Sequence, residues 1–109
     1  MEVEERWFRL LVSGEKPIEG RKKSPTWEKI KVDQEIVVIC KETCEVRRFI
    51  VTHINEYKTL EEYLIQEGLH RCLPGVISIE EGIEIYQTWS TPQELAKYGF
   101  LAIGLRVIN

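Results

Sequence analysis

Long hydrophobic runs, internal repeats and low-complexity tracts are all missing from this sequence, which excludes a membrane span, a solenoid and a disordered chain. No apolar stretch is long enough for the core of a signal peptide, and acidic residues follow the first methionine. We therefore expect a cytoplasmic protein with no membrane partner. Nothing in the composition indicates an obligate protein partner.

Cysteine is scarce: the chain has three, an odd number that excludes a complete set of intramolecular disulfides. Reduced thiols that are buried or flank a hairpin are the simple interpretation. A tetrahedral zinc site with sulfur and nitrogen ligands is the alternative. Its ligands would be Cys40, Cys44, His70 and Cys72. The C-x3-C spacing is loose and no second close pair supports it, so we expect no metal.

Familiar enzyme motifs are missing as well. The sequence has no phosphate loop, no G-x-S-x-G, no H-E-x-x-H and no dinucleotide fingerprint. His53 ends an apolar stretch and His70 stands beside Arg71, and a structural or solvated role fits both histidines better than that of a general base. We expect no required cofactor.

At 109 residues the chain is long enough for one domain, 1–109, that buries roughly two thirds of its unfolded surface. Its net charge of −3 argues against non-specific coating of nucleic acid, which depends on neutralising many phosphates. The basic residues are nevertheless uneven. Five of them lie in the stretch 21–31, whereas 55–94 is rich in glutamate, so we expect one basic face.

Local patterns predict the first elements of the fold. Apolar spacing indicates a helix over 4–12 that stops at Gly14, followed by an extended edge segment over 16–21. A continuous β-branched run at 35–40 and the stretch 45–54, joined by a short polar link, indicate a hairpin.

Three helix starts follow, each with a hydroxyl residue and a glutamate three positions later that can exchange bonds with free backbone N–H groups. The pairs are Thr59 with Glu62, Ser78 with Glu81, and Thr91 with Glu94. Gly68 and Gly99 suit the left-handed positions that end the first and third helices. A strand at 100–108 closes the chain. We therefore expect an α+β fold, a small and mostly antiparallel β-barrel with helices outside.

The segment SGEKPIEGR brings together three charged residues that could carry chemistry: Lys16, Glu19 and Arg21. In a concave site, a carboxylate between two cations offers donors to phosphate or a base edge and one acceptor to an exocyclic amine. The alternative is a partly exposed salt-bridge network, because surface charge pairs are common and contribute little. On the residue types alone, the salt-bridge network is favoured.

The same segment resembles the G-x-K-x-[IV]-E-x-R signature of the ASCH domains, a family related to the PUA domains. IKVDQEIVV is similar to the family's second strand, I-K-x-G-D-x-I-x-F, and PQELAKYGFLAIGLRVI to its end, where an acidic helix leads through K-Y-G-V-x-A-I into the last strand. Two positions depart from the pattern. Asp33-Gln34 replaces the usual Gly-Asp, which should loosen that turn, and Pro17 stands where Thr or Lys is common.

This resemblance covers nearly the whole chain and implies a PUA-like barrel of five or six strands, with a cleft between barrel and helices. Lys16, Glu19 and Arg21 would form one wall of that cleft, and the implied ligand is RNA, a nucleotide or a modified nucleoside. Lys16 and Arg21 would hold phosphate or ribose, while Glu19 would orient them or accept from a base amine. Trp27 would either stack on a base or cover the barrel end. We expect Lys16→Ala and Glu19→Ala to weaken binding with little loss of fold stability.

A small amidohydrolase is the first alternative. The resemblance includes a branch that removes the acetyl group from N4-acetylcytidine with the motif lysine, a threonine three residues later and a glutamate from elsewhere. Here Lys16 is kept, but Glu19 takes the place of the threonine. An adjacent carboxylate also favours a charged ammonium over the free amine that attack requires. The second carboxylate would be Glu81, Glu84 or Glu94.

A protein-interaction module is the second alternative. It would use the aromatic residues Tyr86, Trp89 and Tyr98. Ile79 and Ile83 continue the stripe of Tyr86 and Trp89 at helical spacing, which favours packing of this helix on the barrel. An exposed patch of several hundred square ångströms would reopen the alternative.

Overall fold

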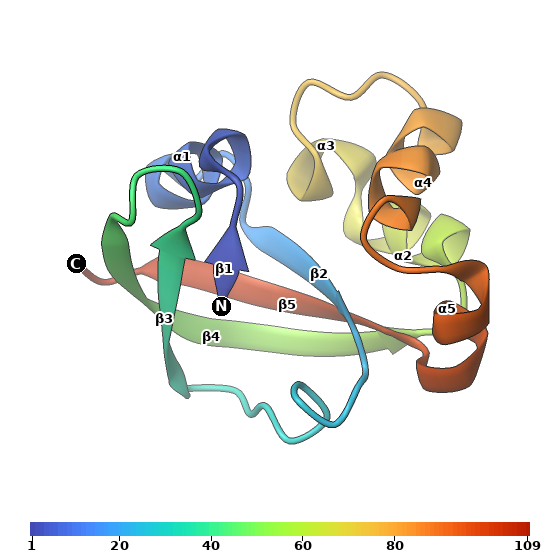
Figure 1. Cartoon of the computed structure of the whole chain (residues 1–109), viewed down its shortest axis with the longest axis horizontal. Coiled ribbons are helices and arrows are strands. Elements are labelled where there is room, and N and C mark those ends of the chain that lie inside the picture. Colours follow the sequence, from blue (N-terminus) through green and yellow to red (C-terminus); the bar gives the residue numbers. More distant parts are fainter.

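The computed structural model describes all 109 residues and consists of one curved, five-stranded sheet with five helices (Figure 1). The strands are β1 (Glu2–Val3), β2 (Ile18–Lys22), β3 (Glu35–Cys40), β4 (Val46–Tyr57) and β5 (Phe100–Val107). The helices are α1 (Glu5–Ser13), α2 (Leu60–Glu67), α3 (Leu69–Cys72), α4 (Ile79–Gln87) and α5 (Pro92–Tyr98). The predicted α+β class is confirmed.

The strand order is β1-β3-β4-β5-β2, so that β1 and β2 are the two edges of the sheet. β1 pairs with β3 in parallel, and the other three pairings are antiparallel, including the predicted hairpin of β3 and β4. The sheet curls into a half-barrel that stays open between its edges. β2, the segment expected at an edge, is an edge strand, whereas the two-residue β1 was not predicted.

Successive side chains of each strand point to opposite faces of the sheet. Apolar side chains are buried on both faces. On one face, Ile103 and Leu105 of β5 join a buried cluster with Phe49 of β4. On the other face, Phe100 and Ala102 pack in a second cluster that also contains residues of α2 and α4. Figure 1 shows α1 at one end of the sheet and α2 to α5 gathered at the other.

The predicted helix starts are present. The hydroxyl oxygens of Thr59, Ser78 and Thr91 each accept a hydrogen bond of 3.1 Å from the glutamate N–H three residues later. Only the Thr91 start, at α5, has the reciprocal bond of a complete capping box. Gly68 and Gly99 do end α2 and α5, but with ψ angles of 117° and −174°. Their backbone is therefore extended at positive φ rather than left-handed helical, because the chain leaves at once into α3 and β5.

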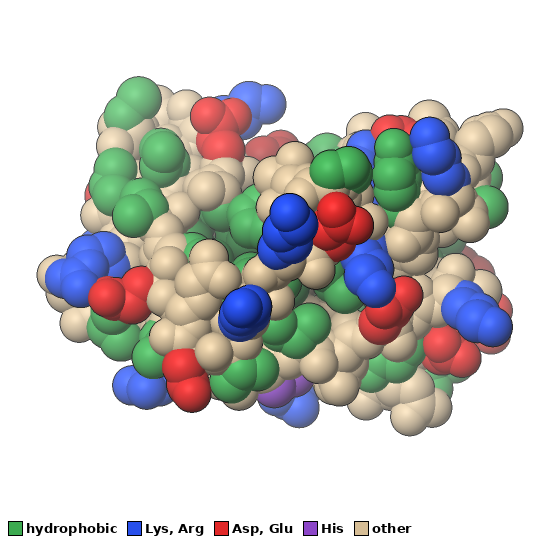
Figure 2. All heavy atoms as spheres, turned by 90° about the horizontal axis from the view of Figure 1, so that it is seen from below, with side chains coloured by type: hydrophobic (Ala, Val, Ile, Leu, Met, Phe, Trp, Pro, Cys, Tyr) green, Lys and Arg blue, Asp and Glu red, His purple; other side chains and the backbone are tan.

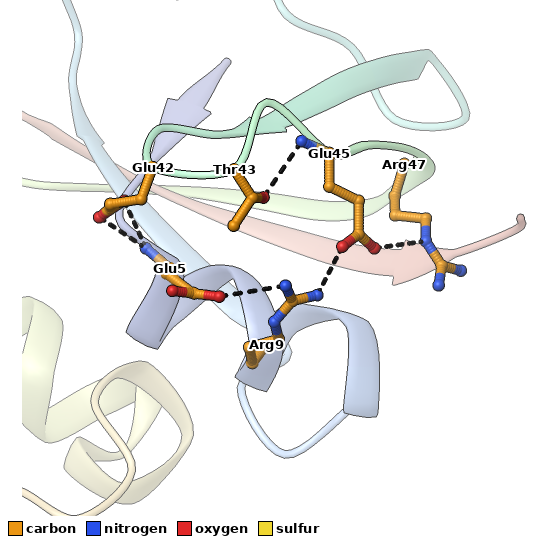
Figure 3. A network of polar contacts seen from close by, with 6 residues as sticks. All are labelled: Glu5, Arg9, Glu42, Thr43, Glu45 and Arg47. Atoms are coloured by element: carbon orange, nitrogen blue, oxygen red, sulfur yellow. Dashed lines mark hydrogen bonds and ion pairs between the residues drawn. The ribbon is translucent and has the colours of Figure 1, made fainter.

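A surface network fastens α1 to the turn between β3 and β4 (Figure 3). The backbone N–H of Glu5 donates to the Glu42 carboxylate at 2.9 Å, which gives the helix N-terminus an acidic partner. Arg9 bridges Glu5 and Glu45, at 3.1 Å and 2.7 Å. The hydrogen bond from Arg9 holds the pKa of Glu45 below its usual value. Because these pairs are exposed, each adds little stability.

None of the helices combines the length and the apolarity that a bilayer crossing requires. The three cysteines are free thiols, and no three His, Cys, Asp or Glu side chains come together in a metal-binding arrangement. The zinc alternative at Cys40, Cys44, His70 and Cys72 is therefore not supported by the fold.

Candidate ligand-binding cleft

A cleft of about 340 Å³ lies where the two edge strands face each other. It is lined by residues of β1 and β2, of the loop after β2, of the end of α4 with the turn that follows, and of the start of β5. Sites for small molecules typically measure about 300–1,000 Å³. The open side of the half-barrel therefore provides a site of suitable size for a small ligand.

Lys16 is buried beneath this cleft, with 1% of its surface exposed. It reaches this position because Gly14 ends α1 with φ +87°, and the chain turns back so that the Lys16 N–H donates to the Leu10 carbonyl. The ammonium donates to the carbonyls of Ile18 at 2.6 Å and Cys72 at 2.5 Å. Together with Glu19, which lies 3.3 Å away, these oxygens engage the ammonium fully and leave no N–H for a ligand.

Glu19 stands between two cations and is 7% exposed. One carboxylate oxygen lies 3.3 Å from the Lys16 ammonium, and the other accepts from Arg21 at 2.9 Å. Burial raises the pKa of Glu19, but the charges of Lys16 and Arg21 outweigh it, so that the pKa lies below its usual value. The carboxylate is therefore ionised at neutral pH. Each oxygen keeps a lone pair, which makes Glu19 a fixed acceptor at the cleft.

Arg21 lies on the same face of β2 as Glu19 and bridges the two edge strands. Its Nη2 donates to Glu19 and, at 3.0 Å, to the carbonyl of Glu2 in β1. Both bonds use Nη2, and the buried Nε–H has no partner. Among the three motif residues, Arg21 is therefore the one that has donors left for a ligand.

All three tryptophans of the chain line the cleft. Trp7 is buried, and Trp27 is half-buried against the apolar cluster while it also faces the cleft. Trp27 thus combines packing on the core with a place in the lining of the cleft. Trp89, in the turn after α4, is 47% exposed. Its place in the cleft was not predicted, because it depends on tertiary packing of α4, such as that of Tyr86 on Phe100, which the local sequence does not indicate.

The aromatic and apolar residues considered for protein interaction differ in their surroundings. Tyr86 is buried against Phe100, with ring centroids 5.3 Å apart, and Ile79 and Ile83 pack on the same cluster. Helix packing, the favoured interpretation, is confirmed for these three residues. Tyr98 is half-buried and does not line the cleft.

The carboxylates considered for hydrolysis are not in the cleft. Glu81 and Glu84 lie outside it, and Glu94 pairs with Lys22 at its rim, at 2.5 Å. The hydrogen bonds from Lys22 and from the Thr91 backbone lower the pKa of Glu94 to about 2. None of the three glutamates stands beside Lys16 as a second catalytic carboxylate would.

The model of the ASCH domain family matches residues 1–109. The chain therefore belongs to the ASCH domain family, as the resemblance predicted, and this family is generally RNA-binding-like. Among curated proteins, none matches the chain.

Solved structures share this fold. The chain is 32% identical to the hypothetical protein PH0355, with a TM-score of 0.85 over 99% of this chain and 100% of that one. It is 33% identical to the protein PF0455 from Pyrococcus furiosus, with a TM-score of 0.78 over 100% and 99%. A mutant of ZmASCH from Zymomonas mobilis shares the fold at 16% identity and a TM-score of 0.66, covering 100% and 73%. The expected PUA-like fold is confirmed.

Proposed function

We propose that this ASCH protein binds an RNA- or nucleotide-type ligand in the cleft. Glu19 and Arg21 contact the edge of a base or its sugar, Lys16 holds Glu19 in place, and Trp27 offers an aromatic wall. The observation that carries the proposal is the Glu19 carboxylate, buried and ionised between two cations in a cleft of about 340 Å³.

The chemistry of the wall suits a nucleobase. A base edge carries hydrogen-bond donors and acceptors side by side, and here an acceptor, Glu19, stands next to the donors of Arg21. Proteins that bind single-stranded nucleic acids stack the bases on aromatic side chains beside such groups. Because Glu19 is buried, any lone pair of its carboxylate that lacks a donor costs free energy. A ligand that supplies a matching donor is therefore favoured.

The distribution of surface charge favours a compact ligand over an extended RNA bound along the surface. On the side of the loop that joins β2 to β3, basic and acidic side chains are interspersed and form no continuous basic stripe (Figure 2). In the basic stretch 21–31, Lys22 and Lys23 form ion pairs with glutamates, at 2.5 Å and 2.8 Å. Neutralised lysines add little to phosphate binding, which is driven by the release of counterions.

Binding without turnover is the version that we propose. The Lys16 ammonium faces three oxygen atoms, so it has no lone pair to attack a carbonyl carbon. Glu19 stands where the hydrolase pattern has a hydroxyl. The amidohydrolase alternative would require Lys16 to lose its proton and to leave both carbonyls.

The test is a titration followed by two-dimensional NMR, with cytidine, N4-acetylcytidine, nucleoside monophosphates and a short single-stranded RNA as probes, and product analysis of each sample. We expect shifts centred on 16–21 and on the tryptophan indoles, and no deacetylated product. Glu19→Gln keeps the shape and removes the charge, so it should weaken binding, whereas the exposed Glu61→Gln on α2 should not. If no probe shifts the cleft signals of the wild-type protein, the proposal is wrong.

A further inference from the structure

Trp89 differs from the other two tryptophans of the cleft in what covers its ring. The Arg6 guanidinium lies 4.2 Å from the Trp7 ring centroid, and the Arg21 guanidinium lies 5.7 Å from that of Trp27. No cation lies over Trp89, which is also the most exposed of the three. Its indole is thus the aromatic surface of the cleft that no charged side chain occupies.

The ring of Trp89 is nevertheless held in place. It meets Tyr86 edge to face, with centroids 5.6 Å apart and planes at 79°. Tyr86 is itself fixed by a 2.8 Å bond between its hydroxyl and that of Tyr63, and by the ring of Phe100. An edge-to-face contact leaves at least one indole face uncovered by Tyr86. A rigid and uncovered aromatic face binds a flat ring at low entropic cost.

The charges of the cleft cancel. Four basic side chains line it, and three of them are engaged: Lys16 and Arg21 hold Glu19 between them, and Lys22 pairs with Glu94. The remaining one is Lys41, and two further carboxylates, those of Glu2 and Glu4, line the same cleft. A phosphate entering this cleft therefore meets no excess of positive charge.

We propose that Trp89 is the stacking surface for the ligand and that the cleft takes an uncharged aromatic ring, as in a base or nucleoside, with any phosphate left outside and adding nothing to affinity. This inference rests on the proposed function, because it specifies which part of a nucleotide-type ligand the cleft holds. Stacking on one aromatic side chain implies a loss of roughly 5- to 150-fold in affinity when that side chain is truncated.

The experiment compares cytidine and adenosine with their 5′-monophosphates and with pyrophosphate, by calorimetry and by the three indole N–H signals. We expect each nucleoside and its monophosphate to bind within threefold of each other, at 50 and at 300 mM salt alike, and pyrophosphate not to bind. Trp89→Ala should weaken nucleoside binding at least fivefold, and Trp89→Phe should restore part of it. Ile77→Ala, another exposed apolar residue outside the cleft, should leave affinity unchanged.

Other outcomes separate the two proposals. If the probes bind in the cleft but Trp89→Ala has no effect, or if the monophosphates bind more than tenfold tighter and lose affinity with salt, the inference is overturned and the proposed function stands. If no probe shifts any cleft signal, both are overturned. Trp89 is half-exposed, so the variant should fold, and its remaining amide spectrum verifies this.

Discussion

At the scale of single residues, Lys16 is the most consequential side chain of the site. A buried ammonium costs several kcal/mol of desolvation unless oxygen atoms surround it. Here they come from Ile18, Cys72 and Glu19. The family resemblance predicted that Lys16 and Glu19 belong to one wall of the cleft. It could not predict the burial, because the Cys72 carbonyl comes from a helix 56 residues away.

Lys16→Met should lower the free energy of unfolding by about 3–5 kcal/mol, because removal of one partner leaves the buried Glu19 carboxylate and two carbonyls short of a donor. This revises the expectation from the sequence that Lys16 can be truncated with little loss of stability. Urea unfolding at pH 7 measures the effect, with the exposed Lys29→Met as the matched control. Equal unfolding midpoints for the two variants would show that Lys16 does not stabilise the fold.

Gly20 is a second residue whose role only the packing reveals. A Cβ at this position would lie 2.5 Å from the Phe100 ring and 2.7 Å from the Tyr63 hydroxyl. Gly20→Ala should therefore cost about 1–3 kcal/mol of stability through overpacking. Adding Phe100→Leu should recover part of this cost, which a double-mutant cycle measures. Simple additivity of the two substitutions would contradict the proposed clash.

At the scale of elements, short sequence patterns predicted the elements that are stabilised by interactions between neighbouring residues. The β3–β4 hairpin and the three hydroxyl caps were identified from short stretches. β4 continues to Tyr57, beyond the predicted end at 54, because β5 pairs with it along that length. β1 and α3 are two and four residues long, too short to show a periodicity. Such elements depend on their tertiary partners.

Hydrogen bonds of the Glu67 carboxylate connect the end of α2 to the last residues of β4, and the stability of this junction should depend on pH. The buried Glu67 carboxylate accepts from Tyr57, from Asn55 at 2.9 Å and from His53 at 3.3 Å. Burial raises the pKa of Glu67, but these three hydrogen bonds outweigh it and the pKa lies below the ordinary 4.5. The stability that Glu67 contributes is therefore complete above the unfolded value and is lost as pH falls through the lower, folded pKa.

Glu67→Gln should accordingly lower stability at pH 7 by about 1–3 kcal/mol, because the amide cannot accept at both ends. The difference between wild type and variant should shrink as pH falls below the ordinary carboxyl range. Urea unfolding at pH 7, 5 and 3 measures both effects, with Glu61→Gln on the same helix as the control. A difference that stays constant over this range would mean that the charge of Glu67 is not what stabilises the junction.

At the scale of the whole molecule, the site is the opening left by an incomplete barrel. The resemblance to a known family predicted the architecture and the wall of Lys16, Glu19 and Arg21. The place of Trp89 in the cleft was not predicted. The cleft is lined by residues between positions 2 and 100, and no local sequence pattern describes such an arrangement. Since β1 holds only two residues and has one neighbour, one side of the cleft is also the weakest part of the sheet.

Native-state amide exchange should reveal this weakness. The N–H groups of Ile39 and Lys41 donate to the carbonyls of Met1 and Val3, both at 2.8 Å, and so hold β1 to β3. They should exchange faster than the N–H groups between β4 and β5, which lie in the middle of the sheet. Arg21→Met removes the bond that ties β2 to Glu2, so it should accelerate exchange at Ile39 and Lys41 while the β4–β5 amides keep their rates. NMR exchange at constant pH measures both sets in one sample. If all amides accelerated equally, β1 would open only with global unfolding, and the cleft would be a rigid cavity. Selective acceleration would mean that Arg21, a proposed ligand contact, also stabilises the β1 edge of the cleft against local opening.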